Sequence, residues 1–397
     1  MLNGPYSPWP SFSEEEANAV RDVLLSSKVN YWTGQEGRQF EREFADYIDT
    51  EYAIALANGT VALDLALIAL GVGAGDEVIV TSRTFLASVS SIVNAGAVPV
   101  FADVDSDSQN ITAQTIAAVI TPRTRAIICV HLAGWPCDMD PIMSLAQQND
   151  CFVIEDCAQA HGARYKGRAV GSIGHVGCWS FCQDKIMTTG GEGGMVTTND
   201  KELWSKMWSF KDHGKSWEAV YEREHPPGFR WLHESFGTNW RMTEMQAAIG
   251  RIQLSRMPQW HDTRFRYAEQ IWNTARKLTG LRVPDFRCGS CNGCTQQQGC
   301  AHAAYKCYLF VEGTAEQRDQ IMHQINERGV PCFSGSCSEV YLEKAFDDTG
   351  WRPEQPLPVA RQLGDTSLMF LVHPTLTQAE IDKTCEVLMQ VVSAYFG

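Results

Sequence analysis

Short apolar segments alternate with longer segments of helical periodicity from about residue 13 to residue 200. The apolar segments lie at 52–56, 76–80, 98–104, 125–132 and 151–157. Between them, segments such as 61–71 and 113–120 carry apolar residues at the spacing of an amphipathic helix. Strands that alternate with helices form a mostly parallel sheet covered by helices on both faces. The sequence therefore predicts an α/β fold whose ligand lies at the carboxyl ends of the strands.

The chain after residue 202 has a different pattern, which is mainly helical up to about residue 275. A long helix around 240–275 is expected to link two domains. It is followed by an apolar strand at 304–312 and by helices at 315–329 and 379–395. This order predicts a smaller α+β domain at the carboxyl end. We place the large domain at 1–254 and the small domain at 255–397, with a Cys-rich insertion near 287–301.

Composition excludes several classes of protein. The formal net charge of −14 disfavours general binding to nucleic acid, which requires basic surfaces. No uncharged apolar run approaches the roughly 18 residues of a membrane-spanning helix. The first residues lack a basic region followed by an apolar run, so no secretory signal is expected. The 14 cysteines are therefore expected to be reduced thiols of a cytoplasmic protein.

The segment from Val153 to Asn199 carries the chemistry of the chain. An apolar strand ends in Asp156, and Ser180 precedes Lys185 by five residues in front of a glycine-rich run. Pyridoxal 5'-phosphate (PLP) needs a carboxylate beside its ring nitrogen, a lysine for its aldehyde and a helix N-terminus for its phosphate. Asp156, Lys185, Ser180 and the turn at 58–60 supply these groups.

Each of these features alone has an ordinary structural explanation. An aspartate at a strand end often caps a helix, and a lysine beside glycines is usually a solvated loop residue. Asn-Gly-Thr before a helical segment is more often a turn with an N-cap than a phosphate site. The three features together, in this order, are far more specific for PLP than any one of them.

Six segments extend this pattern over nearly the whole chain: NGTVALDLAL, TFLASVSSIVNAGAVPVFADVD, VHLAGWPCDMD, EDCAQAHGARYKGRAVGSIG, SFCQDKIMTTGGEGG and TNWRMTEMQAAIG. They resemble the motifs of the DegT/DnrJ/EryC/StrS family of sugar aminotransferases. That family is a branch of the fold-type I PLP enzymes in the aspartate aminotransferase superfamily. The resemblance implies a homodimer with shared active sites.

The resemblance also implies roles for individual residues. Lys185 is the Schiff-base lysine, and Asp156 pairs with the pyridinium nitrogen. The other implied cofactor contacts are Gln159 near the phenolic oxygen, Phe85 on the ring face, Gly59, Thr60 and Ser180 at the phosphate, and Asn239 at the phosphate of the neighbouring subunit. Candidate substrate residues are Trp32, Thr33 and Gln35, which match a sugar-contacting segment of the family, and His131, which ends a strand.

Two departures from the family pattern stand near the site. The lysine is followed by four residues and then by Gly-Gly-Glu-Gly-Gly, one glycine more than usual, so the role of Glu192 is open. Ala133 stands where the family often has tyrosine, which is expected to widen the pocket.

A cluster of cysteines is not recognised as a family feature. Cys288, Cys291, Cys294 and Cys300 have the spacing C-x2-C-x2-C-x5-C, with His302 close by. Four such thiols suit a structural zinc ion or an iron–sulfur cluster. The alternative is a loop of free thiols.

The sequence thus predicts a PLP-dependent transaminase that moves an amino group from glutamate to a keto sugar, most simply a nucleotide-linked keto-deoxyhexose of surface polysaccharide or lipopolysaccharide. An alternative acceptor is a free keto sugar acid such as an eight-carbon octulosonate. Alternatives of other classes are a PLP-binding regulator and a sulfur-transfer enzyme. Related dehydratases have histidine in place of the lysine, so Lys185 argues against that chemistry.

Overall fold

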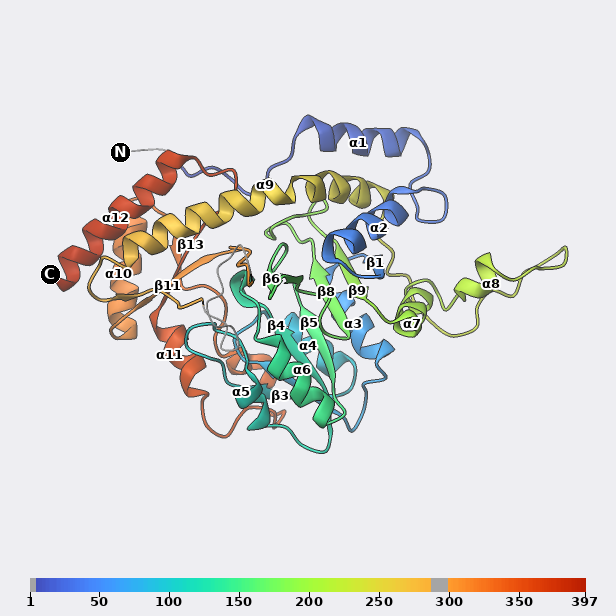
Figure 1. The fold of residues 1–397 in the computed structure, drawn as a ribbon, viewed down its shortest axis with the longest axis horizontal. Helices are drawn as coiled ribbons and strands as arrows, with labels where there is room; N and C mark the ends of the chain where they lie inside the picture. The colour runs from blue at the N-terminus through green and yellow to red at the C-terminus, as the bar shows by residue number, and fades with distance from the viewer. Residues whose placement is uncertain (1–4, 287–298) are drawn as a thin grey trace.

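A computed structural model describes residues 5–286 and 299–397 of the chain (Figure 1). Its large sheet has seven strands in the order β1-β9-β8-β5-β4-β2-β3. Strand β9 is antiparallel to both of its neighbours, and the other adjacent pairs are parallel. The predicted α/β class is confirmed. The strands are β1 (Tyr52–Leu56), β2 (Glu77–Thr81), β3 (Val98–Ala102), β4 (Thr124–Val130), β5 (Phe152–Asp156), β8 (Val176–Ser180) and β9 (Gly194–Thr198).

Helices cover both faces of this sheet because successive side chains of each strand point to opposite sides. On β2 and β4, Val80 and Ile128 face one core, whereas Ile79 and Ile127 face another. The first core includes α3 (Gly59–Ala69), α4 (Ala87–Asn94) and α7 (Lys201–Lys211). The second includes α5 (Ala113–Ala117) and α6 (Met139–Gln148), and α2 (Glu36–Ile48) covers the strands at the β1 end.

The carboxyl-terminal part of the chain forms a second, smaller sheet that packs against helices. Four antiparallel strands lie in the order β10-β11-β13-β12. They pack with helices α10 (Ala315–Glu327) and α12 (Gln378–Phe396) around a core that includes Ile321, Leu368 and Leu388. The remaining bounds are β10 (Leu281–Arg282), β11 (Cys307–Val311), β12 (Cys332–Phe333), β13 (Ser367–Phe370) and α11 (Pro358–Thr366), with a small ribbon of β6 (Arg164–Tyr165) and β7 (Arg168–Ala169) on the large domain.

Helix α9 (Glu244–Ala275) joins the two sheets over 32 residues. Thr243 caps it by accepting a hydrogen bond from the Gln246 amide. It packs first against α1 (Glu14–Leu25) and α2, and then against α12 and β11 (Figure 1). The division after residue 254 falls inside this continuous helix and stays a prediction. The amino-terminal segment reaches the small domain, since the Tyr6 hydroxyl donates to the Glu380 carbonyl at 3.0 Å.

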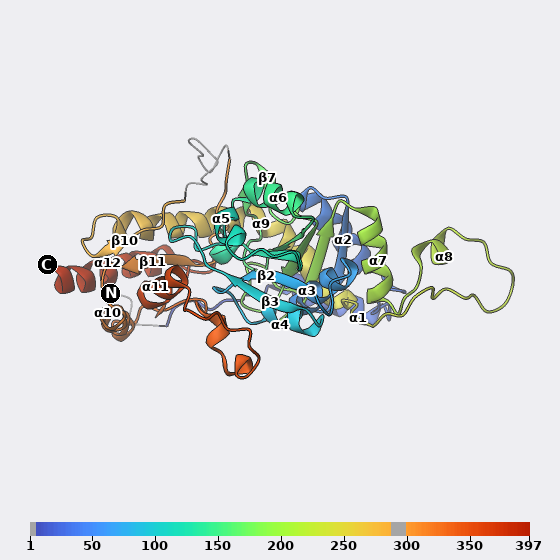
Figure 2. The ribbon, with the colours of Figure 1, turned by 90° about the horizontal axis from the view of Figure 1, so that it is seen from below.

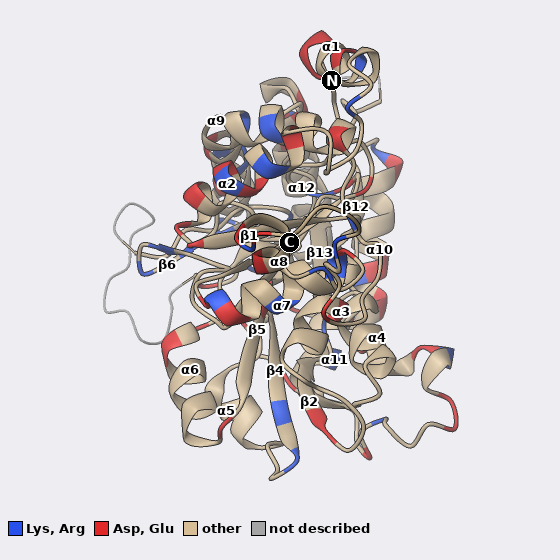
Figure 3. Cartoon of the chain, turned by 90° about the vertical axis from the view of Figure 1, so that its right-hand side faces the viewer, with Lys and Arg blue, Asp and Glu red and all other residues tan. Residues whose placement is uncertain are grey.

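A segment between α7 and α9 projects from the body of the molecule and carries α8 (Trp217–Tyr221) (Figures 1 and 2). Its outer part exposes the aromatic side chains of Phe229, Trp231 and Phe236. Acidic and basic positions are interspersed over the elements in Figure 3. Within the described ranges, no helix is both long enough and apolar enough to cross a bilayer.

Candidate active site

Asp156 is the last residue of β5, which lies in the middle of the large sheet. Its Oδ2 accepts a hydrogen bond from the Ser88 hydroxyl at 2.7 Å, and its Oδ1 accepts one from the Ala158 amide at 3.1 Å. Burial raises the pKa of Asp156, although both hydrogen bonds and the charge of Lys185 act to lower it. Because these groups do not offset the cost of burying its charge, the Asp156 carboxylate is suited to bind a protonated ring nitrogen of a ligand.

Lys185 lies in the loop between β8 and β9, and its backbone is held from two sides. Its amide donates to the Cys182 carbonyl at 3.0 Å, and its carbonyl accepts from Trp9 Nε1 at 2.8 Å. Its Nζ lies 3.5 Å from Asp184 Oδ1. Lys185 follows β8, which pairs with β5 beside Asp156, so the structure brings the two predicted catalytic residues to the same edge of the sheet.

The turn between β1 and α3 meets the end of β8. Asn58 caps α3 by accepting a hydrogen bond from the Val61 amide at 3.0 Å. A Cβ on Gly59 would lie 2.6 Å from Ser180 Cβ, so glycine permits the close approach of the two segments. The free amides at the start of a helix favour an anion. Gly59, Thr60 and Ser180 therefore form a cradle that fits a phosphate group.

Two further predicted cofactor contacts lie on neighbouring loops. Gln159 Oε1 accepts a hydrogen bond from the Ala133 amide at 2.8 Å, which fixes its side-chain amide. Ala133 reaches this position with a positive φ of 56°. Phe85, in the turn before α4, keeps 72% of its surface exposed. Its ring is therefore free to stack on a planar ligand.

His131 has a different place from the one expected for a substrate contact. It is fully buried, and its Nε2 donates to Glu155 Oε2 at 3.0 Å. Its Nδ1 accepts from the Cys137 amide at 3.0 Å. Both ring nitrogens are thus used, which corrects the expectation of a pocket histidine. His131, Glu155 and Cys157 lie close enough together to suit a metal ion, but both ring nitrogens of His131 already take part in these hydrogen bonds.

The other candidate sugar contacts cluster around α7. Trp32 packs against Trp208, and the Lys215 Nζ lies 4.0 Å from the centre of its ring. Thr33 is exposed and donates to the Asn30 carbonyl at 3.2 Å, while Gln35 is the N-cap residue of α2. Their role in binding a sugar stays a prediction.

Asn239 is exposed on the returning arm of the projecting segment. Its backbone forms a bridge with Asp212, and the next carbonyl, of Trp240, accepts from the Ala57 amide at 2.9 Å. Asn239 therefore lies near the start of the turn at 58–60. Which subunit's phosphate it contacts stays a prediction.

The extra glycine after Lys185 is accommodated by backbone conformation. Gly190 and Gly191 both have positive φ, at 86° and 120°. The Glu192 carbonyl accepts from Thr189 Oγ1 and Gln246 Nε2, at 2.6 and 2.7 Å. The Cys182 thiol donates to Glu192 Oε1 at 3.9 Å.

The cysteine cluster is described only at its end. Cys288, Cys291 and Cys294 lie outside the described residues. Cys300 is buried, and its sulfur accepts from the Lys166 amide at 3.4 Å. His302 is buried among Trp135, Trp272 and Phe286, and burial followed by the charge of His261 lowers its pKa to about 3. The proposed metal site stays a prediction.

Several residues near Lys185 have no counterpart among the sequence predictions. They are Ser88 and Asp184, described above, and Trp9, Arg264, Tyr305 and Lys306, which come from distant parts of the chain.

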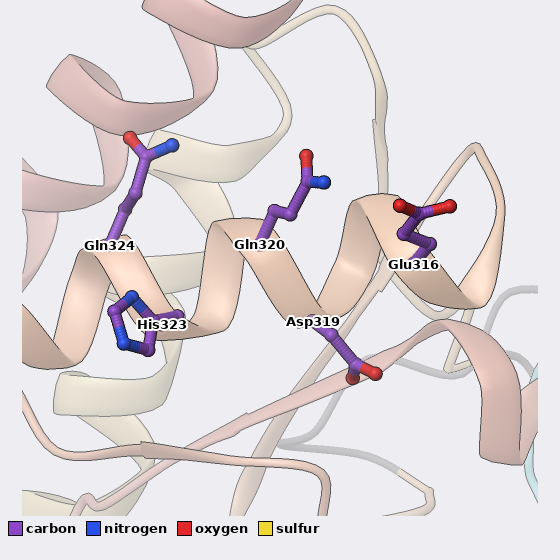
Figure 4. Close-up of a pocket in the computed structure, with 5 residues that line it drawn as sticks. All are labelled: Glu316, Asp319, Gln320, His323 and Gln324. Carbon is purple, nitrogen blue, oxygen red and sulfur yellow. The ribbon is translucent and has the colours of Figure 1, made fainter.

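An exposed groove on α10 contains none of the predicted cofactor or substrate residues (Figure 4). The side chains that line the groove all come from one helix: Glu316, Asp319, Gln320, His323 and Gln324.

The site as a whole fits PLP. Asp156 can hold the ring nitrogen, Lys185 can bind the aldehyde, and the cradle of Gly59 and Ser180 can take the phosphate. When bound, PLP supplies an aldehyde that condenses with amines and a ring that accepts electrons from the adjacent carbon. Fold and site together define a PLP-dependent transferase.

The chain belongs to the DegT/DnrJ/EryC1/StrS aminotransferase family, whose model matches residues 10–389. It is 38% identical over 383 residues to GDP-perosamine synthase of Caulobacter vibrioides, covering 94% of this chain and 95% of that one. It is 44% identical over 383 residues to UDP-N-acetyl-3-dehydro-alpha-D-glucosamine 3-aminotransferase of Acidithiobacillus ferrooxidans, with the same coverage.

A solved aminotransferase structure from Psychrobacter cryohalolentis is similar over 99% of this chain and 100% of that one, with 62% identity and a TM-score of 0.94. These relationships identify the protein as a PLP-dependent sugar aminotransferase. The expected family and enzyme class are thereby confirmed.

Proposed function

We propose that the protein transfers the amino group of glutamate to a nucleotide-linked keto-deoxyhexose for surface polysaccharide or lipopolysaccharide synthesis in the cytoplasm. The convergence of Lys185, Asp156 and the Gly59–Ser180 cradle supports an amino transfer. The relatives named for GDP-perosamine and for a UDP-linked amino sugar support a nucleotide-linked acceptor. A free keto sugar acid remains the alternative acceptor.

The residues of the site divide the work. With PLP bound, Lys185 Nζ would remove the proton from the Cα of the donor and would then carry that proton as an ammonium group. Asp156 would hold a negative charge beside the ring nitrogen and so favour its protonated form. Ser180 and the first turn of α3 anchor the phosphate, so that the reacting atoms stay within reach of Lys185. The acceptor gains the amine by the reverse sequence.

The direct test is a reaction in two halves. Holoenzyme mixed with glutamate alone is expected to release one 2-oxoglutarate per active site, and the aminated enzyme is then offered a panel of keto sugars. Lys185→Ala is expected to abolish the reaction, whereas Lys201→Ala, on the surface of α7, leaves it unchanged.

Reduction with borohydride followed by peptide mapping identifies the lysine that carries the cofactor. A cofactor-labelled lysine in an active Lys185→Ala variant would contradict the assignment. Sulfide released from cysteine would favour the sulfur-transfer alternative. Cofactor binding with no turnover of any amino acid would favour the regulator.

A homodimer with shared active sites is part of this proposal. The exposed aromatic side chains at 229, 231 and 236 suit burial against a second subunit. Asn239 on the same segment is the residue expected to cross between sites. Mixed dimers of Lys185→Ala and Asn239→Ala subunits, each inactive alone, are expected to regain activity. No recovery in verified heterodimers would mean that each site is built within one chain.

We further propose that Cys288, Cys291, Cys294 and Cys300 bind a structural metal ion, zinc in preference to an iron–sulfur cluster. Four thiolates within thirteen residues favour ligation over free thiols, which oxidise readily when exposed. Elemental analysis of protein purified anaerobically without added metal tests this. Less than about a tenth of an equivalent of zinc and iron in active enzyme would exclude a metal that the fold requires.

A further inference from the structure

Arg264, on the inner side of α9, has no carboxylate partner among the residues that the structure describes. Its side chain is 2% exposed, and within the described residues its Nε and Nη2 have no hydrogen-bond acceptor. Its guanidinium carbon lies 4.9 Å from the centre of the Trp9 ring. Burial lowers the pKa of Arg264 to about 9, with only Tyr305 opposing the shift. Burial of an unpaired guanidinium is costly, so the position is suited to an anionic ligand.

Lys306, immediately before β11, lies beside the same site. Its Nζ is 4.8 Å from the centre of the Tyr305 ring, and the Lys185 Nζ is 5.4 Å from that centre. Burial and the charge of Arg264 lower the pKa of Lys306 to about 8, while Asp184 acts in the opposite direction. Lys185 and Lys306 therefore lie beside the same aromatic ring, and the charge of Arg264 acts on Lys306.

Asp184 is a carboxylate that compensates this group of cations. It accepts a hydrogen bond from the Tyr305 hydroxyl at 2.5 Å and lies 3.5 Å from the Lys185 Nζ. Nearby histidines add no further positive charge. Burial and the neighbouring cations lower the pKa of His161 and of His373 to about 3, so both rings are neutral. Among the described residues, these three cations thus meet two carboxylates, Asp184 and Asp156, which leaves the site with excess positive charge.

We propose that Arg264 and Lys306 bind a carboxylate of the amino donor beside Lys185, an assignment that rests on the proposed transamination. A guanidinium offers two parallel N–H donors to a carboxylate, and an ammonium adds a second positive charge. Trp9 connects the two parts of the site, since its ring lies under Arg264 and its Nε1 donates to the Lys185 carbonyl.

The burial of the two cations favours a terminal carboxylate over a larger anion. Arg264 is fully buried, whereas Lys306 is only partly buried. A carboxylate at the end of a short chain needs less space beside a buried guanidinium than a diphosphate that carries a nucleoside. An acidic keto sugar could supply the same group, and the experiment must separate it from the donor.

Binding of glutarate, which has the two carboxylates of glutamate but no amine, tests the site without turnover. Titration calorimetry on the holoenzyme is expected to show that Arg264→Gln weakens glutarate binding at least about 10-fold, and Lys306→Gln about 3- to 10-fold. Arg264→Lys is expected to restore part of the affinity. Arg266→Gln is the matched control, because Arg266 lies exposed on the same helix.

The two half-reactions identify the source of the carboxylate. In the glutamate half-reaction, Arg264→Gln is expected to raise KM at least about 10-fold with a smaller change in kcat. The keto sugar half-reaction of the aminated enzyme is expected to keep its KM. A rise in KM for the sugar alone would overturn the assignment to the donor.

Unchanged glutarate binding in both Arg264→Gln and Lys306→Gln would overturn the carboxylate site itself. Failure of the proposed function has a different signature. In that case wild-type holoenzyme would release no 2-oxoglutarate from glutamate, yet it would still bind glutarate in a manner that depends on Arg264.

Discussion

Glu155 and Asp156 are consecutive residues at the end of β5, and they serve opposite sides of the sheet. Glu155 accepts hydrogen bonds from His131 and from the amides of Gly171, Ile173 and Gly174. Burial raises its pKa, but these donors more than compensate, so the pKa of Glu155 is lowered overall. For Asp156, burial outweighs the contribution of its donors, and its pKa is raised.

The difference shows how one strand end provides both a structural and a chemical carboxylate. Side chains alternate along a strand, so neighbouring residues meet separate surroundings. The side with many backbone amides saturates Glu155 and fixes the loop at 171–174. The side that faces Lys185 leaves Asp156 with few donors. Asp156 therefore retains the capacity to stabilise a positive charge on a ligand.

The largest expected effect separates the two carboxylates by activity. Asp156→Asn is expected to slow proton removal from glutamate by about three orders of magnitude, because a neutral amide cannot hold a protonated ring nitrogen. Stopped-flow single turnover of the holoenzyme measures this rate. Glu155→Gln is the control, and its folded fraction is expected to react at nearly the normal rate. Near-normal turnover by Asp156→Asn would refute its role.

The second expected effect distinguishes Glu155 from Asp156 by the stability of the folded protein. Glu155→Gln is expected to lower the free energy of unfolding by about 3 kcal/mol, since it disrupts a buried charged network. The pKa of Glu155 is depressed in the folded state, so its contribution is present above the unfolded value near about 4.3 and is lost as the pH falls below it. Urea denaturation at several pH values should show that the difference in the free energy of unfolding between wild type and Glu155→Gln becomes smaller in acid. A constant difference would contradict the electrostatic explanation.

The smallest expected effect has the opposite sign. In cofactor-free protein, Asp156→Asn is expected to raise the free energy of unfolding by about 1 kcal/mol at neutral pH. The raised pKa means that the ionised carboxylate costs stability above its folded pKa, and that this cost fades as the pH falls toward the unfolded value. Denaturation of both cofactor-free proteins at neutral and acidic pH measures it. A loss of stability like that of Glu155→Gln would show that Asp156 is also a structural residue.

Much of the fold was predictable because strands buried on both faces leave continuous apolar runs. The run at 52–56 is β1, and those at 98–104 and 151–157 contain β3 and β5. Strands β8 and β9 were not identified individually, because Gly177 and Gly194 lie in them and glycine-rich loops flank them. Helical periodicity was expected from about residue 13, but no individual helix was assigned before residue 50, because few apolar residues form the buried faces of α1 and α2.

The sequence prediction of the site rested mainly on residues of one segment, to which the turn at 58–60 added the expected phosphate position. Asp156, Ser180 and Lys185 lie within one segment whose order carries the chemistry. Arg264 belongs to an amphipathic helix, where an inward arginine cannot be distinguished from a surface one by sequence. His131 was assigned to the pocket because a strand end has the same pattern whether its side chain meets a ligand or Glu155. Only the packed structure decides between these two surroundings.

The length of α9 has a consequence for how such a chain can change. A helix of 32 residues is about 48 Å long, and each residue advances the helix by about 100°. One inserted residue between Gly250 and Arg264 would turn Arg264 away from Lys185 and shift every contact with the small domain. Substitutions along α9 can be absorbed locally, but insertions and deletions cannot. Length variation compatible with this fold therefore belongs in the loops that α9 connects.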